Sequence, residues 1–329
     1  MPPAPMRAVV GHELGPPGNY HIEPRDPGSP GPDEVRIAIH AAGVSYVDVL
    51  TAGGGYQVRP PVPFVPGSEC AGVVEAVGIG VSGLSPGDAV VASSWGGLFA
   101  DAAVLPARSV KPAPAGLSLA EAAVFPVSYY TARLALVERA RLRSGETLLV
   151  LGAGGATGYA AIQLGKHLGA RVIASASTEA KRALAMTGGA DVAIDARAGD
   201  WREQIRAANG GKGVDVVFDP VGGPVTEPAF RALGWNGRHL VVGFTAGIAQ
   251  FRTNLPLLKG ASLVGVDLRQ FGIHEAAAAA ANSAAVFALA EAGVLRPAIG
   301  KTYPLEGFAD AMAEAASGAT AGRIVLTMR

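Results

Sequence analysis

The chain has 329 residues, with 27 basic and 27 acidic side chains and a formal net charge of zero. This length predicts two domains, each with enough apolar residues to form its own core. A neutral balance without a basic block argues against nucleic acid or an anionic membrane surface as a partner.

We expect no membrane-spanning segment. The stretch Ala276–Gly293 is rich in alanine, but it is short and includes Asn282 and Glu291, so an ordinary helix is predicted there. The first ten residues, Met1–Val10, lack the apolar core of a signal peptide. The sequence therefore predicts a cytoplasmic protein.

The chain contains a single cysteine, Cys70, which excludes an intrachain disulfide and a cysteine-rich structural zinc site. Its neighbours in Gly67–Gly72 are mostly small, and we predict a buried, unreactive thiol. The six histidines are scattered without the spacing of metal ligands.

The first third of the chain predicts a partly open all-β barrel. It is rich in proline and glycine, and turn signals such as Pro30-Gly31-Pro32 separate short β-like runs. These runs are Met6–Val10, Glu34–Ala41, Ala71–Val77, Ala89–Ala92 and Leu98–Val104.

From about residue 128, apolar runs alternate with helical segments, which is typical of a parallel, doubly wound α/β sheet of the Rossmann type. The predicted strands are Thr147–Leu151, Arg171–Ala174, Val192–Ile194, Val214–Asp219, His239–Val242 and Ser262–Val266. The predicted helices are Gly155–Leu168, Thr178–Thr187, Trp201–Asn209 and Val225–Leu233. After about Asp267 we expect the alanine-rich helix, a helix near Phe308–Ala316 and a strand, Ile324–Thr327.

A glycine-rich turn follows the first of these parallel strands. Glycines allow a backbone to turn sharply and approach a ligand, and the helix that follows directs free N–H groups toward it. The spacing is G-x-x-G-x-x-G rather than the usual G-x-G-x-x-G, but the strand–turn–helix context is that of a dinucleotide site. The predicted cofactor-binding residues of this turn are Gly152, Gly154, Gly155, Ala156, Thr157 and Gly158.

Several further motifs follow one another along the chain: Ala41–Asp48, Pro66–Val74, Val77-Gly78, Gly87–Val90, the glycine-rich turn, Phe218–Gly222 and Gly237-Arg238. In this order and spacing, they together resemble the zinc-free medium-chain dehydrogenases/reductases, specifically the quinone oxidoreductase (ζ-crystallin-like) branch. The resemblance covers nearly the whole chain. It implies a GroES-like catalytic domain, residues 1–127 plus 268–329, into which a Rossmann dinucleotide-binding domain, residues 128–267, is inserted.

No metal is expected in the active site. Zinc-using relatives hold the metal at positions that correspond here to Ser45, Ser68 and Val127, none of which supplies a thiolate or an imidazole. Without zinc as a Lewis acid, hydride transfer to a quinone or an α,β-unsaturated carbonyl is the chemistry that remains.

NADPH is the predicted cofactor. Ala176 stands at the end of the second parallel strand, where NAD-using enzymes usually place an acid that binds the ribose 2′-hydroxyl. Ser177 can hydrogen-bond a 2′-phosphate and Lys181 can supply a positive charge, and the resemblance implies a lysine at this spacing.

Two further positions bear on this phosphate. Arg323 is a candidate third contact. The tyrosine that the family frequently carries after the third strand is replaced by Ala196 or its neighbour Arg197, so the family's phosphate pocket is not fully matched.

The resemblance implies three residues at the reacting end of the acceptor site. Tyr56 corresponds to a tyrosine that can donate a proton in related enoyl reductases, and a phenol is a plausible acid toward an enolate; a loop aromatic that packs beside the substrate is the other interpretation. Tyr46 either lines the same site or packs. Ser45 replaces an asparagine common in the family.

On the nicotinamide side of the cofactor, the resemblance implies contacts from Thr131 and from the backbone of Gly243 and Phe244. Small-molecule acceptors and a homodimer are implied as partners. The interpretation favoured by all these residues is an NADPH-dependent quinone reductase. An enone or enoyl-thioester reductase and a non-catalytic NADPH-binding protein are the alternatives.

Overall fold

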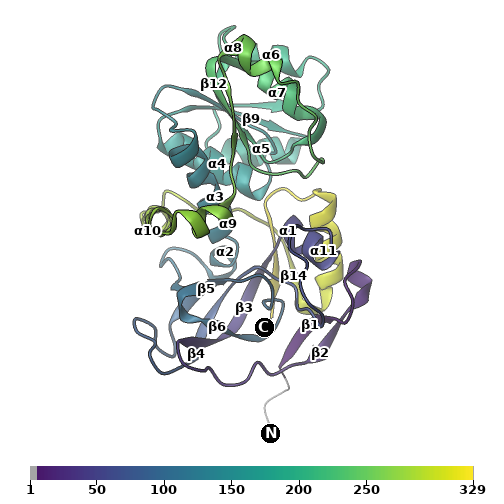
Figure 1. Cartoon of the computed structure of the whole chain (residues 1–329), viewed down its shortest axis with the longest axis vertical. Coiled ribbons are helices and arrows are strands. Elements are labelled where there is room, and N and C mark those ends of the chain that lie inside the picture. The colour runs from purple at the N-terminus through teal and green to yellow at the C-terminus, as the bar shows by residue number, and fades with distance from the viewer. Residues whose placement is uncertain (1–5, 329) are drawn as a thin grey trace. The chain divides into compact units, whose positions relative to one another are not determined.

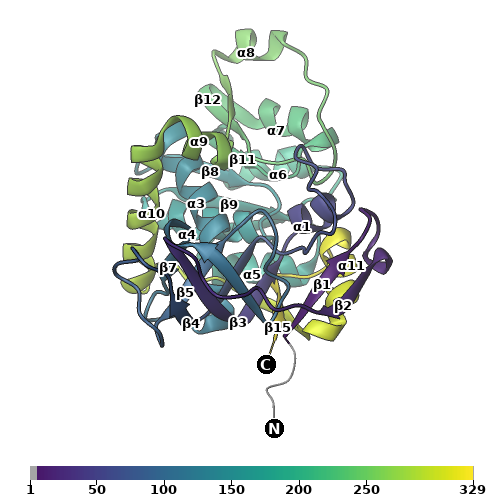
Figure 2. The ribbon, with the colours of Figure 1, turned by 60° about the horizontal axis from the view of Figure 1, so that its bottom comes forward.

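The computed structural model describes residues 6–328. The prediction that no signal peptide is present concerned Met1–Val10, and residues 1–5 of that segment lie outside the described part. The chain forms two compact units (Figure 1). Unit 1 contains Met1–Val127 and Ala298–Arg329, and unit 2 contains Ser128–Pro297. The ends of the described chain meet in unit 1, where Arg7 Nη2 donates to Met328 O at 3.2 Å (Figure 2).

Unit 1 is built on a seven-stranded, mostly antiparallel sheet in the order β14-β15-β3-β4-β5-β7, with β6 paired to β3, and on a separate β1–β2 ribbon. The strands are β1 (Arg7–Gly11), β2 (Tyr20–Pro24), β3 (Glu34–Val44), β4 (Glu69–Val77), β5 (Ala89–Ser93), β6 (Ala102–Pro106), β7 (Val110–Pro112), β14 (Ile299–Pro304) and β15 (Arg323–Thr327). Its helices are α1 (Tyr46–Ala52), α2 (Leu119–Ala122) and α11 (Phe308–Ser317).

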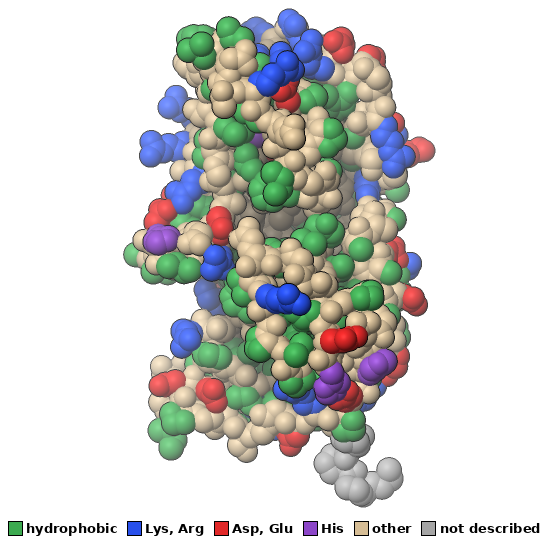
Figure 3. Space-filling model, turned by 45° about the vertical axis from the view of Figure 1, so that its right-hand side comes forward, with side chains coloured by type: hydrophobic (Ala, Val, Ile, Leu, Met, Phe, Trp, Pro, Cys, Tyr) green, Lys and Arg blue, Asp and Glu red, His purple; other side chains and the backbone are tan. Residues whose placement is uncertain are grey.

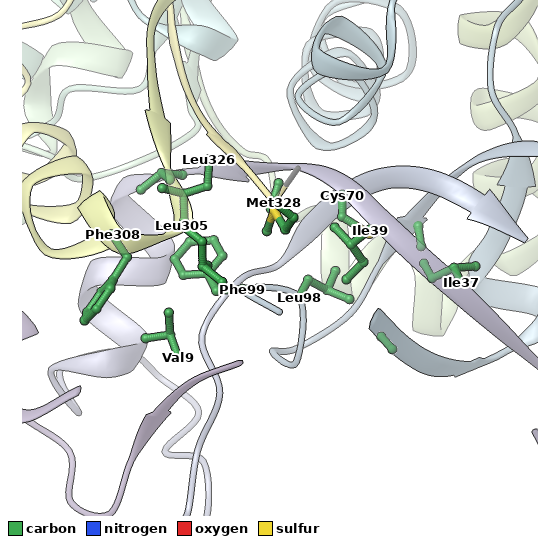
Figure 4. Close-up of a cluster of buried hydrophobic side chains, with 14 of the residues drawn as sticks. Val9, Ile37, Ile39, Cys70, Leu98, Phe99, Leu305, Phe308, Leu326 and Met328 are labelled. Atoms are coloured by element: carbon green, nitrogen blue, oxygen red, sulfur yellow. The ribbon is translucent and has the colours of Figure 1, made fainter. Parts of the chain in front are cut away.

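The predicted strand Leu98–Val104 is wrong in its first half. Leu98 and Phe99 are fully buried, but their backbone N–H groups both bond to Pro66 O rather than to a strand ladder. Leu98 and Phe99 are therefore apolar because they pack in the core, and not because they form a strand. Both belong to the cluster that β1, β3, β4, β15 and α11 enclose, in which the Cys70 thiol is also buried (Figure 4).

Unit 2 is a six-stranded sheet in the order β10-β9-β8-β11-β12-β13, and every neighbouring pair is parallel. In chain order this is 3-2-1-4-5-6, the doubly wound Rossmann arrangement, which confirms the predicted fold class. The strands are β8 (Thr147–Val150), β9 (Arg171–Ala176), β10 (Val192–Asp195), β11 (Val214–Asp219), β12 (Leu233–Val241) and β13 (Ser262–Gly265).

Helices cover both faces of this sheet (Figure 1). On one face, the close approach of Gly165 in α4 to Leu148 and Val172 packs that helix directly onto β8 and β9. On the other face, Trp201 and Phe230, from α6 and α7, join the apolar cluster. The helices are α3 (Pro126–Arg133), which continues into the π-helix η3 (Leu134–Arg139), α4 (Ala156–His167), α5 (Glu179–Thr187), α6 (Trp201–Ala208), α7 (Thr226–Ala232), α8 (Asn254–Lys259), α9 (Leu268–His274) and α10 (Ala276–Glu291).

The segment that contains α9 and α10 belongs to unit 2, although the family resemblance implied that residues 268–329 belong to the GroES-like domain. Buried Asn282 explains part of the difference. Its side chain accepts from Arg133 Nη1 at 3.0 Å and donates to Tyr130 O at 3.1 Å, which ties α10 to α3. The contact boundary therefore lies about thirty residues after the expected one.

Within residues 6–328, no helix combines the length and apolar character needed to cross a membrane. Figure 3 shows one face of the molecule, on which basic and acidic side chains are interspersed, in keeping with the zero net charge of the sequence.

Candidate functional site

The backbone of the glycine-rich turn lies close to the backbone of the first turn of α4. Gly152 has a φ of +56°, and a Cβ added to Gly158 would lie 2.3 Å from Gly152 O, so the first turn of α4 packs directly on the turn. Gly155 is the N-cap of α4 and has no side chain with which to cap the first N–H groups of the helix. A cradle of this kind, with free N–H groups at the positive end of a helix, fits a dinucleotide pyrophosphate.

Three loops meet at the carboxyl edge of the sheet. A Cβ added to Gly152 would touch Val221 and Pro220 at 3.2 and 3.3 Å, and Gly243 approaches Pro220 O, with a Cβ there only 2.9 Å away. The predicted cofactor residues Gly152, Gly243 and the exposed Phe244 thus follow β8 and β12 at one edge, around the loop that leaves β11.

Asp219 holds that loop in place, and the site prediction did not include it. Its Oδ1 accepts from the N–H groups of Val221 and Gly222, both at 2.9 Å, while Oδ2 accepts from Thr226 Oγ1 at 2.8 Å and contacts His239 Nε2 at 3.0 Å. Burial raises the pKa of Asp219, but the hydrogen bonds from His239 and the loop outweigh it, so the net shift is downward. Asp219 lies in the Phe218–Gly222 motif, which was the available signal.

Lys181 lies against the same cradle from α5. A Cβ added to Gly154 would be 2.5 Å from Lys181 Cβ, and Thr178 caps α5 by accepting from Lys181 N at 3.3 Å. Half-buried Ser177 immediately precedes this cap, directly after β9. The structure therefore brings Lys181 to the glycine-rich turn, and its contact with a 2′-phosphate stays a prediction.

Thr131 is half-buried on α3, which other helices of unit 2 hold firmly. Tyr129 Oη donates to Gln163 Oε1 in α4 at 2.7 Å, and Ser283 Oγ in α10 donates to Tyr130 Oη at 2.9 Å. These bonds fix the helix that carries Thr131. Its contact with a nicotinamide stays a prediction.

In unit 1, Ser45 is the N-cap of α1. Its hydroxyl donates to Asp48 Oδ2 at 2.6 Å and accepts from Asp48 N at 3.3 Å, forming a capping box. Asp48 is buried, and burial raises its pKa against the opposing hydrogen bonds from Ser45 and Ser68. Tyr46 is half-buried in the first turn of the same helix.

Arg323 does not have the surroundings of a phosphate ligand. It is 8% exposed in β15 and forms a buried ion pair with Glu69 in β4. Burial raises the pKa of Glu69, and the positive charge of Arg323 opposes that shift. Because its guanidinium is paired with a buried carboxylate, Arg323 is not available to bind the 2′-phosphate.

Tyr56 lies beside Trp95, with ring centroids 6.2 Å apart and the planes inclined by 31°. Tyr56 is half-buried, and Trp95 is 53% exposed. The two rings form an aromatic surface that reaches solvent, which suits a flat apolar molecule.

The residues at the positions where zinc-using relatives hold the metal make other contacts here. Ser45 and Ser68 hydrogen-bond Asp48, and Val127 N donates to Glu69 Oε2 at 3.4 Å. Among residues 6–328, no three or more His, Cys, Asp or Glu side chains are grouped so as to hold a metal ion. The donor set at these positions does not fit zinc.

Known protein families match segments of both units. Residues 31–115 match the alcohol dehydrogenase GroES-like domain, and residues 156–285 match the domain family described as zinc-binding dehydrogenase. The chain is 33% identical to quinone oxidoreductase of Homo sapiens over 326 residues, covering 98% of each chain. It is 36% identical to quinone oxidoreductase-like protein 2 of Mus musculus over 301 residues, covering 91% of this chain and 86% of the relative.

A solved structure extends the likeness to three dimensions. A mycobacterial protein complexed with NADPH superposes with a TM-score of 0.89 at 29% identity, covering 98% of this chain and 100% of the other. The glycine cradle, the strand order and these matches converge on a nicotinamide-dinucleotide-binding oxidoreductase, and the chain belongs to the quinone oxidoreductase family of medium-chain dehydrogenases/reductases.

Proposed function

We propose that this protein is an NADPH-dependent reductase that passes hydride to a quinone without the help of zinc. The observation that carries the proposal is the glycine cradle at Gly152–Gly158, against which the stem of Lys181 packs. The names of the quinone oxidoreductase relatives and the NADPH complex of the mycobacterial protein support the acceptor and the cofactor.

Unit 2 is the proposed dinucleotide-binding domain. The first N–H groups of α4 would bind the pyrophosphate, while Ser177 and Lys181 would bind the 2′-phosphate. Thr131, Gly243 and Phe244 would position the nicotinamide. When bound, NADPH supplies the hydride, and the overall change is that NADPH, a proton and a quinone give NADP⁺ and a hydroquinone.

Unit 1 is the proposed catalytic domain, in which the aromatic pair Tyr56 and Trp95 would receive the acceptor. A quinone ring is flat and apolar, and it can stack on either side chain. Tyr46 and Ser45 would border the same acceptor. Most of the rate would come from orientation and exclusion of water, so the protein need supply at most one proton, from Tyr56 or from water.

The donor set supports the proposed zinc independence. The Ser45, Ser68 and Val127 positions offer two hydroxyls and a valine, whereas a catalytic zinc takes thiolate, imidazole or carboxylate ligands. Metal analysis of the purified protein is expected to show substoichiometric zinc, and chelator treatment is expected to leave the rate unchanged. Stoichiometric, chelator-sensitive zinc would overturn this part of the proposal.

We also propose a cytoplasmic homodimer joined through the β13 edge of the unit 2 sheet. β13 is paired on one side with β12, and Leu263 in it is 44% exposed. Trp235, Leu257 and Leu258 nearby are 72%, 82% and 67% exposed, which is unusual for large apolar side chains. Sedimentation of wild type and Leu263→Arg tests this, with a dimer and a monomer expected; a wild-type monomer would refute it.

The proposed reaction is tested by NADPH oxidation with a quinone, an enone and an enoyl-CoA in parallel. Preferred turnover of the quinone is the expected result. Preference for either activated alkene would establish the enone or enoyl-thioester reductase instead. Binding of NADPH without turnover of any acceptor would favour the non-catalytic alternative.

A further inference from the structure

In unit 2, the loop that follows β11 and the loop that follows β12 are packed together with almost no space between their backbones. A Cβ added to Gly222 would lie 2.7 Å from Gly247 O. One added to Gly223 would lie 2.3 Å from Ala246 O. In addition, Ala246 N donates to Val221 O at 2.8 Å. The position of the β12 loop therefore depends on that of the β11 loop.

The β12 loop contains Gly243 and Phe244, which are proposed to position the nicotinamide. The side chain of Phe244 is exposed, so its own packing does not fix it. Its backbone is fixed instead, because a Cβ added to Gly222 would lie only 3.1 Å from Phe244 Cα. Asp219 O also accepts from Val242 N at 2.9 Å and from Gly243 N at 3.3 Å. Asp219 and the loop that follows it thus set where the proposed nicotinamide contacts lie.

The side chain of Asp219 connects this loop to the interior of the sheet. Oδ1 accepts from the N–H groups of Val221 and Gly222, while Oδ2 accepts from Thr226 Oγ1 and lies 3.0 Å from His239 Nε2. An ionised carboxylate can only accept, so this last hydrogen bond requires that Nε2 carries the proton and donates. One carboxylate therefore joins a buried imidazole of β12 to the backbone of the β11 loop.

Packing alone does not account for an imidazole at this position. The His239 side chain is completely buried and stacks on Phe230, with ring centroids 6.0 Å apart and the planes inclined by 30°. Within residues 6–328, its Nδ1 has no hydrogen-bond partner. A buried nitrogen without a partner lowers stability, and an apolar side chain of similar size would avoid that loss. What the ring adds to packing is the hydrogen bond to Asp219.

We infer that His239 is a positioning residue for hydride transfer, which orients Asp219 and, through the β11 loop, the backbone at Gly243 and Phe244. This inference rests on the proposed function and extends it to a residue that touches neither cofactor nor acceptor. The contacts that carry it lie at the ends of β11 and β12, whereas the adenosine end of the cofactor is proposed to lie after β9, at Ser177. Loss of His239 should therefore disturb the nicotinamide end and spare the adenosine end.

The test compares calorimetric titration of NADPH with that of 2′,5′-ADP, which lacks the nicotinamide half. His239→Leu fills the site without a donor, and it is expected to weaken NADPH about tenfold and to leave 2′,5′-ADP within about twofold. The single-turnover rate with a quinone at saturating NADPH should fall at least about tenfold, because a displaced nicotinamide is badly oriented for transfer. In His239→Gln, the amide N–H can take the place of Nε2–H, so affinity and rate should return to within about threefold of wild type.

Should His239→Leu fail to fold, His239→Asn replaces it, since the shorter amide does not reach Asp219 and the same selective loss is expected. The matched pair of Asn and Gln variants then differs only in reach. A folded Leu or Asn variant that loses both ligands equally, or loses neither affinity nor rate, would overturn the inference. So would a Gln variant as defective as the Leu or Asn variant.

Thr147→Val is the control for a loss of stability alone. Thr147 is buried at the start of β8, at the amino end of the same sheet, where its Oγ1 donates to Asn209 Oδ1 at 2.9 Å. This variant should have a lower Tm but the wild-type ratio of NADPH to 2′,5′-ADP affinity, and a selective loss of NADPH in it would overturn the inference. Wild-type protein that does not bind NADPH, or that reduces no quinone, would instead refute the proposed function.

Discussion

Asp219 Oδ2 lies 3.0 Å from His239 Nε2, and both side chains are almost completely buried at the ends of neighbouring strands, β11 and β12. Within the described residues, His239 Nδ1 has no hydrogen-bond partner, so the hydrogen bonding of the ring rests on the contact between Nε2 and Asp219. Because Asp219 also fixes Val221 and Gly222, this contact links the interior of unit 2 to the loop beside Gly152.

Replacement of Asp219 should destabilise unit 2 in a pH-dependent way. Asp219→Asn keeps the shape but weakens four contacts, and we expect a loss of about 1–3 kcal/mol at pH 7. The lowered pKa of Asp219 means that its contribution is complete above the unfolded value near 4 and is lost as the pH falls through the folded value. The difference between wild type and variant should therefore shrink below about pH 4.

Urea unfolding at pH 7, 5 and 3.5 measures this difference. Asp200→Asn, which changes an exposed carboxylate of the same unit, is the control and should stay within about 0.5 kcal/mol of wild type. A gap between wild type and Asp219→Asn that is the same at every pH would show that the charge of Asp219 is not what stabilises the loop.

Two alanine substitutions in the glycine-rich turn should separate folding from binding. A Cβ at Gly158 would lie 2.3 Å from a backbone oxygen, whereas at Gly155 the nearest atom is Gly152 O at 3.3 Å. Gly158→Ala should lower both Tm and NADPH affinity. Gly155→Ala should keep Tm within a few degrees and weaken NADPH at least tenfold, since its methyl group would occupy the approach to the pyrophosphate. Thermal unfolding and fluorescence titration check the pair, and tight NADPH binding by Gly155→Ala would place the pyrophosphate elsewhere.

The buried pair of Arg323 and Glu69 should show strong coupling. Arg323→Met leaves the Glu69 carboxylate buried without its partner, which typically costs about 3–5 kcal/mol. The double variant Glu69→Gln/Arg323→Met should recover much of that loss. Its NADPH affinity should equal that of wild type, as expected for a residue outside the cofactor site. Additive losses in the two single variants would mean that the pair contributes little as a pair.

The aromatic pair in unit 1 should distinguish stacking from proton donation. Tyr56→Phe keeps the ring beside Trp95, so quinone turnover should change less than about threefold, whereas any enone turnover should fall by about 10²-fold if the phenol is the acid. Trp95→Ala should raise the KM for the quinone with a smaller effect on kcat. Unchanged steady-state constants for both acceptors in both variants would remove this surface from the acceptor site.

The parallel sheet could be predicted because its signals are local. Buried apolar strands, glycine turns and amphipathic helices alternate along residues 147–265, and the turn at Gly152–Gly158 lies in the expected context. Strands β2, β7 and β14 were missed because they are short or polar and contain no continuous apolar run.

Contacts between side chains were harder to predict than helices and strands. Arg323 looked like an available cation, and only the fold shows that β15 brings it to Glu69, 254 residues away. Asn282 likewise gave no sign that it would bind α10 to α3. Such contacts depend on long-range packing, which a local pattern does not encode.

The burial of Cys70 has a consequence for a protein that handles quinones. Quinones and enones are electrophiles that alkylate thiolates, and a thiolate needs exposure and an accessible pKa to react. The one thiol of this chain is fully buried, and burial raises its pKa. The protein is thereby insulated from covalent inactivation at cysteine by the acceptors that it is proposed to reduce.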